Sequence, residues 1–127
     1  MLIEVDFAGE VPIYTQVRDQ IVIGIAAGLL KPGETLPSVR RLAADIGINV
    51  HTVNKAYSLL RDEGFLLMDR RSGAEIAPLM TEDPSFDELL SNKLIPVVAE
   101  AICRRMDIED FCLTVRKTYS FIKRGGK

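Results

Sequence analysis

The chain has 127 residues, of which 47% are hydrophobic and 27% are charged, a balance typical of one folded domain with a small appendage. Its formal net charge of −2 argues against non-specific attraction to nucleic acid, so a polyanion would have to meet a local basic patch. No apolar run reaches the roughly 18 residues of a membrane span, and the opening MLIEVDF lacks the basic start of a signal peptide. We therefore expect a cytoplasmic protein with no membrane partner.

The sequence gives little support for an enzyme active site or a metal site. His51 is the only histidine, and neither Cys103 nor Cys112 has another cysteine or a histidine at the spacing of zinc ligands. We expect no metal and no disulfide, with both thiols reduced and partly buried. The sequence contains no recognisable nucleophile with its base, carboxylate pair or glycine-rich phosphate loop. It therefore predicts no catalytic residues, no cofactor and no enzyme activity.

A helix is predicted from about residue 13 to residue 27. Pro12 precedes this segment, apolar residues recur in it every four positions, and Gly28 stands where a helix commonly ends in the left-handed conformation. Apolar residues cover nearly every side of the segment, so we expect the helix to be buried. KPGETLPS follows, and its prolines and glycine predict a tight turn.

Two further helices are separated only by GIN. Ser38 is placed to cap the first, VRRLAADI, which stops at Gly47. Asn49 is placed to cap the second, which ends at Gly64 and carries an apolar stripe on one face and polar side chains on the other. Because so short a connection does not let the two helices lie antiparallel, it predicts that they cross steeply, as in a helix-turn-helix.

A hairpin is predicted after the third helix. FLLMDR and AEIAP form two short strands around RSG, where Gly73 supplies a residue free to adopt a positive φ. MTEDPS is a linker, and from Phe86 onward two helical patterns each carry a broad apolar face. These roughly 40 residues are too few to enclose their own core, so we expect a second copy of the chain to cover them. The alternative is that they fold back onto their own domain.

Three helices followed by a hairpin is the winged helix-turn-helix order, and three motifs add a family resemblance. They are PIYTQ, GLLKPGETLPSVRRLA and NVHTVNKAYSLLRDEG. From Pro12 to about Ile76 the chain resembles the DNA-binding domain of the GntR family of bacterial transcription regulators. The short remainder resembles the YtrA-like subfamily, whose members carry only a pair of helices there. The resemblance implies a mainly α fold with a small β-hairpin wing, a winged helix-turn-helix domain over 1–80 and a helical dimerisation segment over 81–127.

The resemblance also implies a function. It predicts a sequence-specific transcription regulator that binds double-stranded DNA, and we expect a homodimeric repressor on an inverted-repeat operator. It leaves the small-molecule effector unknown. The alternative is a winged-helix module that binds a protein instead of DNA, because a fold does not fix a function.

The expected DNA contacts come from the two crossing helices and the hairpin. The major groove presents a distinct pattern of donors, acceptors and methyl groups for each base pair, and short polar side chains near the start of the recognition helix can read it. Arg40 occupies the arginine of the LPS.R motif, which in the family reaches DNA from the preceding helix. The expected DNA-binding residues are Ser38, Arg40, Asn49, His51, Thr52, Asn54, Lys55, Arg70, Arg71 and Gly73.

These assignments have simpler alternatives. Ser38 and Asn49 could be helix caps alone, and His51 and Lys55 could lie on a solvated face. The wing arginines could do no more than complete a soluble hairpin. The wing also departs from the family pattern, since RRSGAEI stands where many members read RRG.G.F, and Glu75 replaces the usual aromatic or aliphatic residue. An acid there would oppose DNA binding unless it points away.

Overall fold

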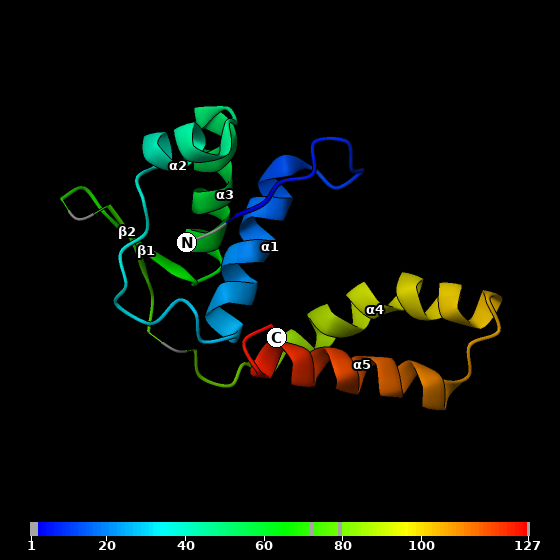
Figure 1. Cartoon of the computed structure of the whole chain (residues 1–127). Helices are drawn as coiled ribbons and strands as arrows, with labels where there is room; N and C mark the ends of the chain where they lie inside the picture. The colour runs from blue at the N-terminus through cyan, green and yellow to red at the C-terminus, as the bar shows by residue number, and fades with distance from the viewer. Residues whose placement is uncertain (1–2, 72, 79, 127) are drawn as a thin grey trace.

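Three helices, a hairpin and two more helices follow one another along the chain. The computed structural model describes residues 3–71, 73–78 and 80–126. The elements of that part are α1 (Ile13–Ala26), α2 (Val39–Ile46), α3 (Val50–Asp62), β1 (Leu66–Asp69), β2 (Gly73–Ile76), α4 (Ser85–Cys103) and α5 (Ile108–Lys123). Figure 1 shows α1, α2, α3 and the hairpin gathered together, with α4 and α5 projecting to one side. The predicted fold class is confirmed, and no described helix is long and apolar enough to cross a membrane.

The hydrophobic core lies among α1, α2, α3 and the hairpin. α1 packs along α3, α2 crosses α3, and β1 continues from α3 over the same core. Its buried side chains include Val17, Ile21, Leu42, Val53, Tyr57, Leu60, Leu66 and Ile76. Burial of a large apolar side chain contributes about 1.5–3 kcal/mol, so this cluster is what holds the crossing helices in place.

α1 is buried along one side only. Val17, Ile21 and Gly24 form its buried side, whereas Ile23 is 48% exposed. The prediction of a buried helix was therefore only partly right: α3 covers α1 from one direction, whereas α5 and the segment before α1 cover its other sides incompletely.

Local hydrogen bonds set the boundaries of α2 and α3. Ser38 Oγ accepts the N–H of Arg41 at 3.1 Å, and α2 ends at Gly47, whose φ is 82°. Asn49 Oδ1 accepts the N–H of His51 at 2.7 Å and so caps α3. Both predicted caps are confirmed, and in Figure 1 the two helices cross instead of running side by side.

The hairpin is joined by a third strand-like segment. β1 and β2 pair antiparallel with Asp69 opposite Gly73, and Gly73 has the predicted positive φ, at 77°. Thr35, in the loop before α2, forms a bridge to Glu75 in the same sheet. The sequence pattern did not predict this pairing. It connects the loop that leads into α2 to the base of the wing.

The segment before α1 is held by two glutamines of that helix. The Asp6 N–H donates to Gln16 Oε1 at 2.8 Å, and Gln16 Nε2 donates to the carbonyl of Val11, also at 2.8 Å. Gln20 makes a similar pair of hydrogen bonds with the backbone of Glu4. The glutamine of the PIYTQ motif therefore has a structural role, because it satisfies backbone groups that no strand partner reaches.

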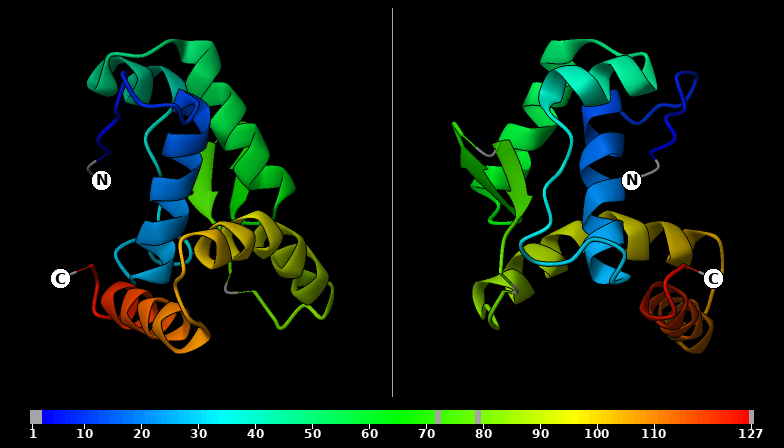
Figure 2. Two further views of the ribbon diagram at one scale, coloured as in Figure 1. Left: turned by 90° about the vertical axis from the view of Figure 1, so that its right-hand side faces the viewer. Right: turned by 60° about the vertical axis from the view of Figure 1, so that its left-hand side comes forward.

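α4 and α5 are only partly covered within one copy of the chain. Among the described residues, none in either helix is buried. The helices diverge from their connecting turn in Figure 2, and the tail meets the domain chiefly where the C-terminal end of α5 lies beside α1. Cys103 and Cys112 are free and exposed, so the prediction of partly buried thiols was wrong for the single chain. The thiols lie outside the few positions of these helices that are half-buried in one copy.

Candidate nucleic-acid interface

α3 presents two faces of opposite character. The side chains that face the core are 0% exposed, and they are Val53, Ala56, Tyr57 and Leu60. On the other side, near the start of the helix, His51, Asn54 and Lys55 are exposed and Thr52 is half-buried. The predicted division of this helix into an apolar and a polar face is therefore present in the structure.

Two of the expected contact residues are occupied as caps. The side-chain oxygens of Ser38 and Asn49 each accept a backbone N–H, from Arg41 and His51 respectively. Both residues are exposed. The hydroxyl hydrogen of Ser38 and the amide NH₂ of Asn49 remain able to donate, so capping leaves each residue one route to an acceptor on DNA.

Arg40 and Arg41 are neighbours on α2 with different surroundings. Arg41 Nε lies 3.8 Å from Asp45 Oδ2, and both side chains are exposed. Arg40 is exposed and, in the part of the chain that the structure describes, has no ion pair or hydrogen bond through its side chain. The guanidinium of Arg40 is thus available for the two parallel hydrogen bonds that a guanine or a phosphate accepts.

Lys55 has a partner that sequence reasoning missed. Its Nζ lies 4.0 Å from the centroid of the Tyr14 ring, so the ammonium group rests on an aromatic face of α1. Such a contact contributes about 0.5–1 kcal/mol at an exposed site. It joins α1 to the polar face of α3. The motifs PIY and NKAY did not predict this contact, because the two segments are far apart in the sequence.

His51 is exposed at the start of α3, and its backbone N–H is taken by the Asn49 cap. Among the described residues, no group of three or more His, Cys, Asp or Glu side chains could hold a metal ion. The imidazole is therefore placed as a surface group of the polar face, with both ring nitrogens open to solvent or to a ligand.

The wing carries its arginines at the turn of the hairpin. Arg70 and Arg71 are exposed, and the Arg71 N–H donates to Asp69 Oδ1 at 2.9 Å, while residue 72 lies outside the described residues. Glu75 is half-buried in β2, paired with β1 on one side and with Thr35 on the other. The acid that departs from the family pattern therefore lies in the body of the sheet, away from the turn.

The start of α3, the side of α2 and the turn of the wing all lie on the part of the molecule away from α4 and α5 (Figure 1). The start of α3 carries the partial positive charge of the helix dipole, which favours a phosphate. This arrangement offers short polar side chains for base edges, flanked by cations for the sugar–phosphate backbone.

A comparison with protein families identifies the family of this chain. Residues 13–76, half of the chain, match the family model described as bacterial regulatory proteins, gntR family. The chain belongs to this family. Within it, the segment from α1 to β2 is the winged-helix DNA-binding domain, as the motifs predicted.

Two transcription regulators are similar to more than half of the chain. The HTH-type transcriptional repressor YtrA of Bacillus subtilis is 41% identical over 76 residues, which is 60% of this chain and 58% of the relative. The HTH-type transcriptional regulator Rv1152 of Mycobacterium tuberculosis is 36% identical over 75 residues, 59% of this chain and 62% of the relative. The match spans about three fifths of each relative, and both relatives regulate transcription.

Solved structures extend the comparison. A transcriptional antiterminator from Listeria monocytogenes has a TM-score of 0.89 over 97% of this chain and 93% of that one, at 24% identity, which shows the same fold including the tail. YtrA from Sulfolobus acidocaldarius, a GntR-family transcription factor, has a TM-score of 0.66 at 37% identity over 78% of this chain and 99% of that one. The AraR DNA-binding domain in complex with operator ORX1 has a TM-score of 0.55 at 29% identity, over 61% of this chain and 99% of that domain.

Proposed function

We propose that this protein is a homodimeric repressor that binds an inverted-repeat operator in double-stranded DNA. The observation that carries the proposal is the exposed polar face at the start of α3 beside Arg40 on α2, whose side chain has no partner among the described residues. This is the geometry in which a recognition helix lies in the major groove while the preceding helix crosses the backbone.

Each part of this surface has a proposed role. Asn54, His51 and Thr52 would read base edges, because their short side chains donate and accept near the helix start. Arg40 would make a bidentate contact with a guanine or a phosphate. The residues proposed to hold the backbone are Ser38, Asn49, Lys55, Arg70, Arg71 and Gly73, the glycine through its exposed backbone at the turn of the wing.

The tail is proposed to make the dimer, with the boundary between the two functional parts near residue 80. Large apolar side chains that would be covered in such a dimer stay open in the single chain, among them Ile95 at 64%, Ile102 at 68% and Tyr119 at 68% exposure. So much apolar surface on two helices without a core is typical of an interface. A two-fold dimer would present two recognition helices to major grooves about 34 Å apart, which is why the operator should be an inverted repeat.

Repression and location are the remaining parts of the proposal. Repression is supported by the similarity to YtrA of Bacillus subtilis, which is described as a repressor. A regulator of a bacterial chromosome acts in the cytoplasm, so we place the protein there. No cofactor and no particular effector forms part of the proposal.

The proposed DNA binding is tested by measuring how well the protein is retained on immobilised duplex DNA as the salt concentration rises. Phosphate contacts release counterions, so the logarithm of the affinity should fall steeply and linearly with the logarithm of the salt concentration. A winged-helix module that binds a protein would show no retention at any salt, and that result would reject the proposal.

The dimer is tested by ending the chain after Met80 and measuring mass in solution and affinity for a bound site. The shortened chain should be monomeric, and its apparent affinity should fall by about 10² or more, because two half-sites would no longer be engaged together. A shortened chain that stays dimeric would assign the interface to the winged-helix domain.

A further inference from the structure

The C-terminal half of α4 is apolar on nearly every side. Residues 94–103 read LIPVVAEAIC, in which Glu100 is the one charged residue, and its carboxylate is paired with Arg104 at 2.8 Å. A helix that is hydrophobic all round is normally enclosed. In the single chain, however, Ile95 and Ile102 are 64% and 68% exposed. This half of α4 therefore lacks cover on at least one side.

An apolar groove lies between the diverging helices α4 and α5. Leu94 and Val97 line it from α4, and Phe111, Val115 and Tyr119 line it from α5. None of the described residues that line it is charged. Ile95 and Ile102 do not line it, because they lie about two turns apart on another side of α4. α4 thus has two apolar sides, and its own chain approaches only one of them.

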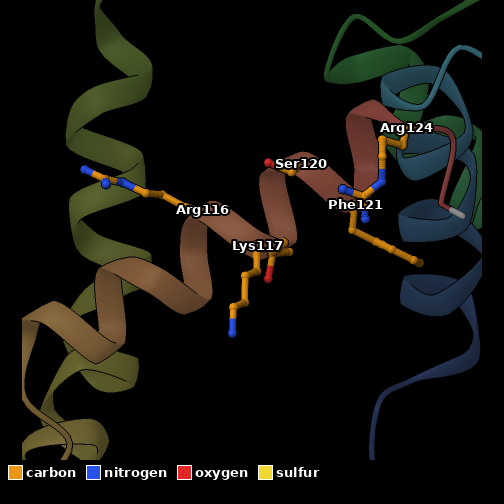
Figure 3. A pocket seen from close by; sticks show the side chains of 6 residues that line it. Arg116, Lys117, Ser120, Phe121 and Arg124 are labelled. Carbon is orange, nitrogen blue, oxygen red and sulfur yellow. The ribbon is translucent and has the colours of Figure 1, made fainter.

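A second hollow, on the side of α5 that adjoins this groove at Thr118, has the opposite character. Arg116, Lys117, Ser120 and Arg124 line it together with Phe121, as Figure 3 shows. Cations and a hydroxyl make it unsuited to an apolar helix, because its polar groups would lose water without gaining partners. Of these two hollows beside α5, the groove facing α4 is the one that matches Ile95 and Ile102.

We propose that the two copies of the chain interlock. The C-terminal half of α4 in each copy enters the groove between α4 and α5 of the other, with Ile95 and Ile102 as the inserted side chains. This inference rests on the proposed homodimer and goes beyond it, since it states which segment of one copy enters which groove of the other. Reciprocal insertion covers both apolar sides of α4 and fills the groove in one arrangement.

Charge supports the direction of this packing. α4 begins with Asp87 and Glu88 and is followed directly by Arg104 and Arg105. If the two-fold axis of the dimer is perpendicular to the axis of α4, the two copies of α4 run antiparallel. The acidic start of each copy then faces the basic end of the other, which is electrostatically complementary, while the C-terminal half, whose Glu100 is paired with Arg104, meets the uncharged groove.

The test uses two full-length variants that carry opposite charges at the two sides of the proposed contact. Ile95→Glu alters the inserted segment, and Val115→Lys alters the groove. Each variant alone places two unpaired charges in an apolar contact, so its self-association, measured by analytical ultracentrifugation, should weaken about 100-fold or more. In a mixed dimer the introduced glutamate meets the introduced lysine at one contact, and the other contact is wild type. Mixing should therefore restore dimers, identified by native mass spectrometry.

Asn92→Glu is the matched control, because it adds the same charge to α4 at an exposed polar position. It should leave the dimer intact, and circular dichroism of every variant should show unchanged helix content. If the wild-type chain is dimeric but the mixture of variants stays monomeric, or if either variant alone remains a tight dimer, the interlocked arrangement is overturned while the homodimer stands. A wild-type chain that is monomeric at micromolar concentration would overturn both.

Discussion

The phenolic oxygen of Tyr57 donates a hydrogen bond to the carbonyl oxygen of Pro37 at 2.8 Å. Tyr57 is 0% exposed in the middle of α3, and Pro37 directly precedes the cap of α2. This bond therefore fixes the start of one helix of the crossing pair against the body of the other. It positions Arg40 relative to the polar face of α3, which is the relationship on which DNA recognition would depend.

Replacing Tyr57 by Phe should lower the free energy of unfolding by about 1 kcal/mol, because the ring still fills the core but the Pro37 carbonyl loses its donor. Urea denaturation measures the change. Tyr14→Phe is the matched control, since the Tyr14 hydroxyl has no hydrogen bond in the described part of the chain and its ring can still face Lys55. Equal effects of the two substitutions would contradict a specific role for the Tyr57 hydroxyl.

Alkaline pH should also weaken the fold through Tyr57. Burial raises the pKa of Tyr57 above its ordinary value, because the phenolate would be desolvated. Above about pH 10 a tyrosine in the unfolded chain loses its proton while folded Tyr57 keeps it, so the unfolded state binds fewer protons and the free energy of unfolding falls as pH rises. Tyr57→Phe should flatten this decline between about pH 9 and pH 11. An identical decline in both proteins would assign it to other groups.

Arg40→Ala should weaken binding to a preferred DNA site by about 1–3 kcal/mol if the guanidinium makes a bidentate base contact. Arg41→Ala is its control, because it removes the same charge from the neighbouring position of α2, where the side chain faces Asp45 and solvent. Fluorescence anisotropy with labelled duplex measures both affinities. Equal losses from the two variants would mean that only the net charge of α2 matters.

The double variant Arg70→Ala, Arg71→Ala should reduce affinity for preferred and scrambled duplexes alike. If each arginine meets a phosphate, the slope of log affinity against log salt should flatten by about 1–2 units, since each contact contributes roughly 0.9. The measurement is a salt series on both duplexes. Loss of discrimination between them at an unchanged slope would show that the wing reads bases.

Features governed by local chemistry were predictable from the sequence. Ser38 and Asn49 cap the helices they were expected to cap, and Gly47 and Gly73 take positive φ where the turns require it. Each of these depends on a residue and its immediate neighbours, so the pattern along the chain was sufficient. The two faces of α3 followed from periodicity for the same reason.

Contacts between distant segments were not predictable in this way. The Lys55–Tyr14 contact and the bridge from Thr35 to Glu75 join segments that only the folded chain brings together. The exposure of Ile23 on α1 depended on how many elements surround that helix, which composition did not reveal. Within the interface, the sequence proposed the contact residues, and the structure added which of them already have partners inside the protein.

Selection of bound sequences from random duplex DNA by the full-length protein tests the central claim most directly. We expect an enriched motif with dyad symmetry, in which two half-sites lie about one helical turn or a multiple of it apart, because a two-fold dimer presents two copies of α3 to the same side of the duplex. Enrichment of a motif without a dyad, or no enrichment at all, would contradict it.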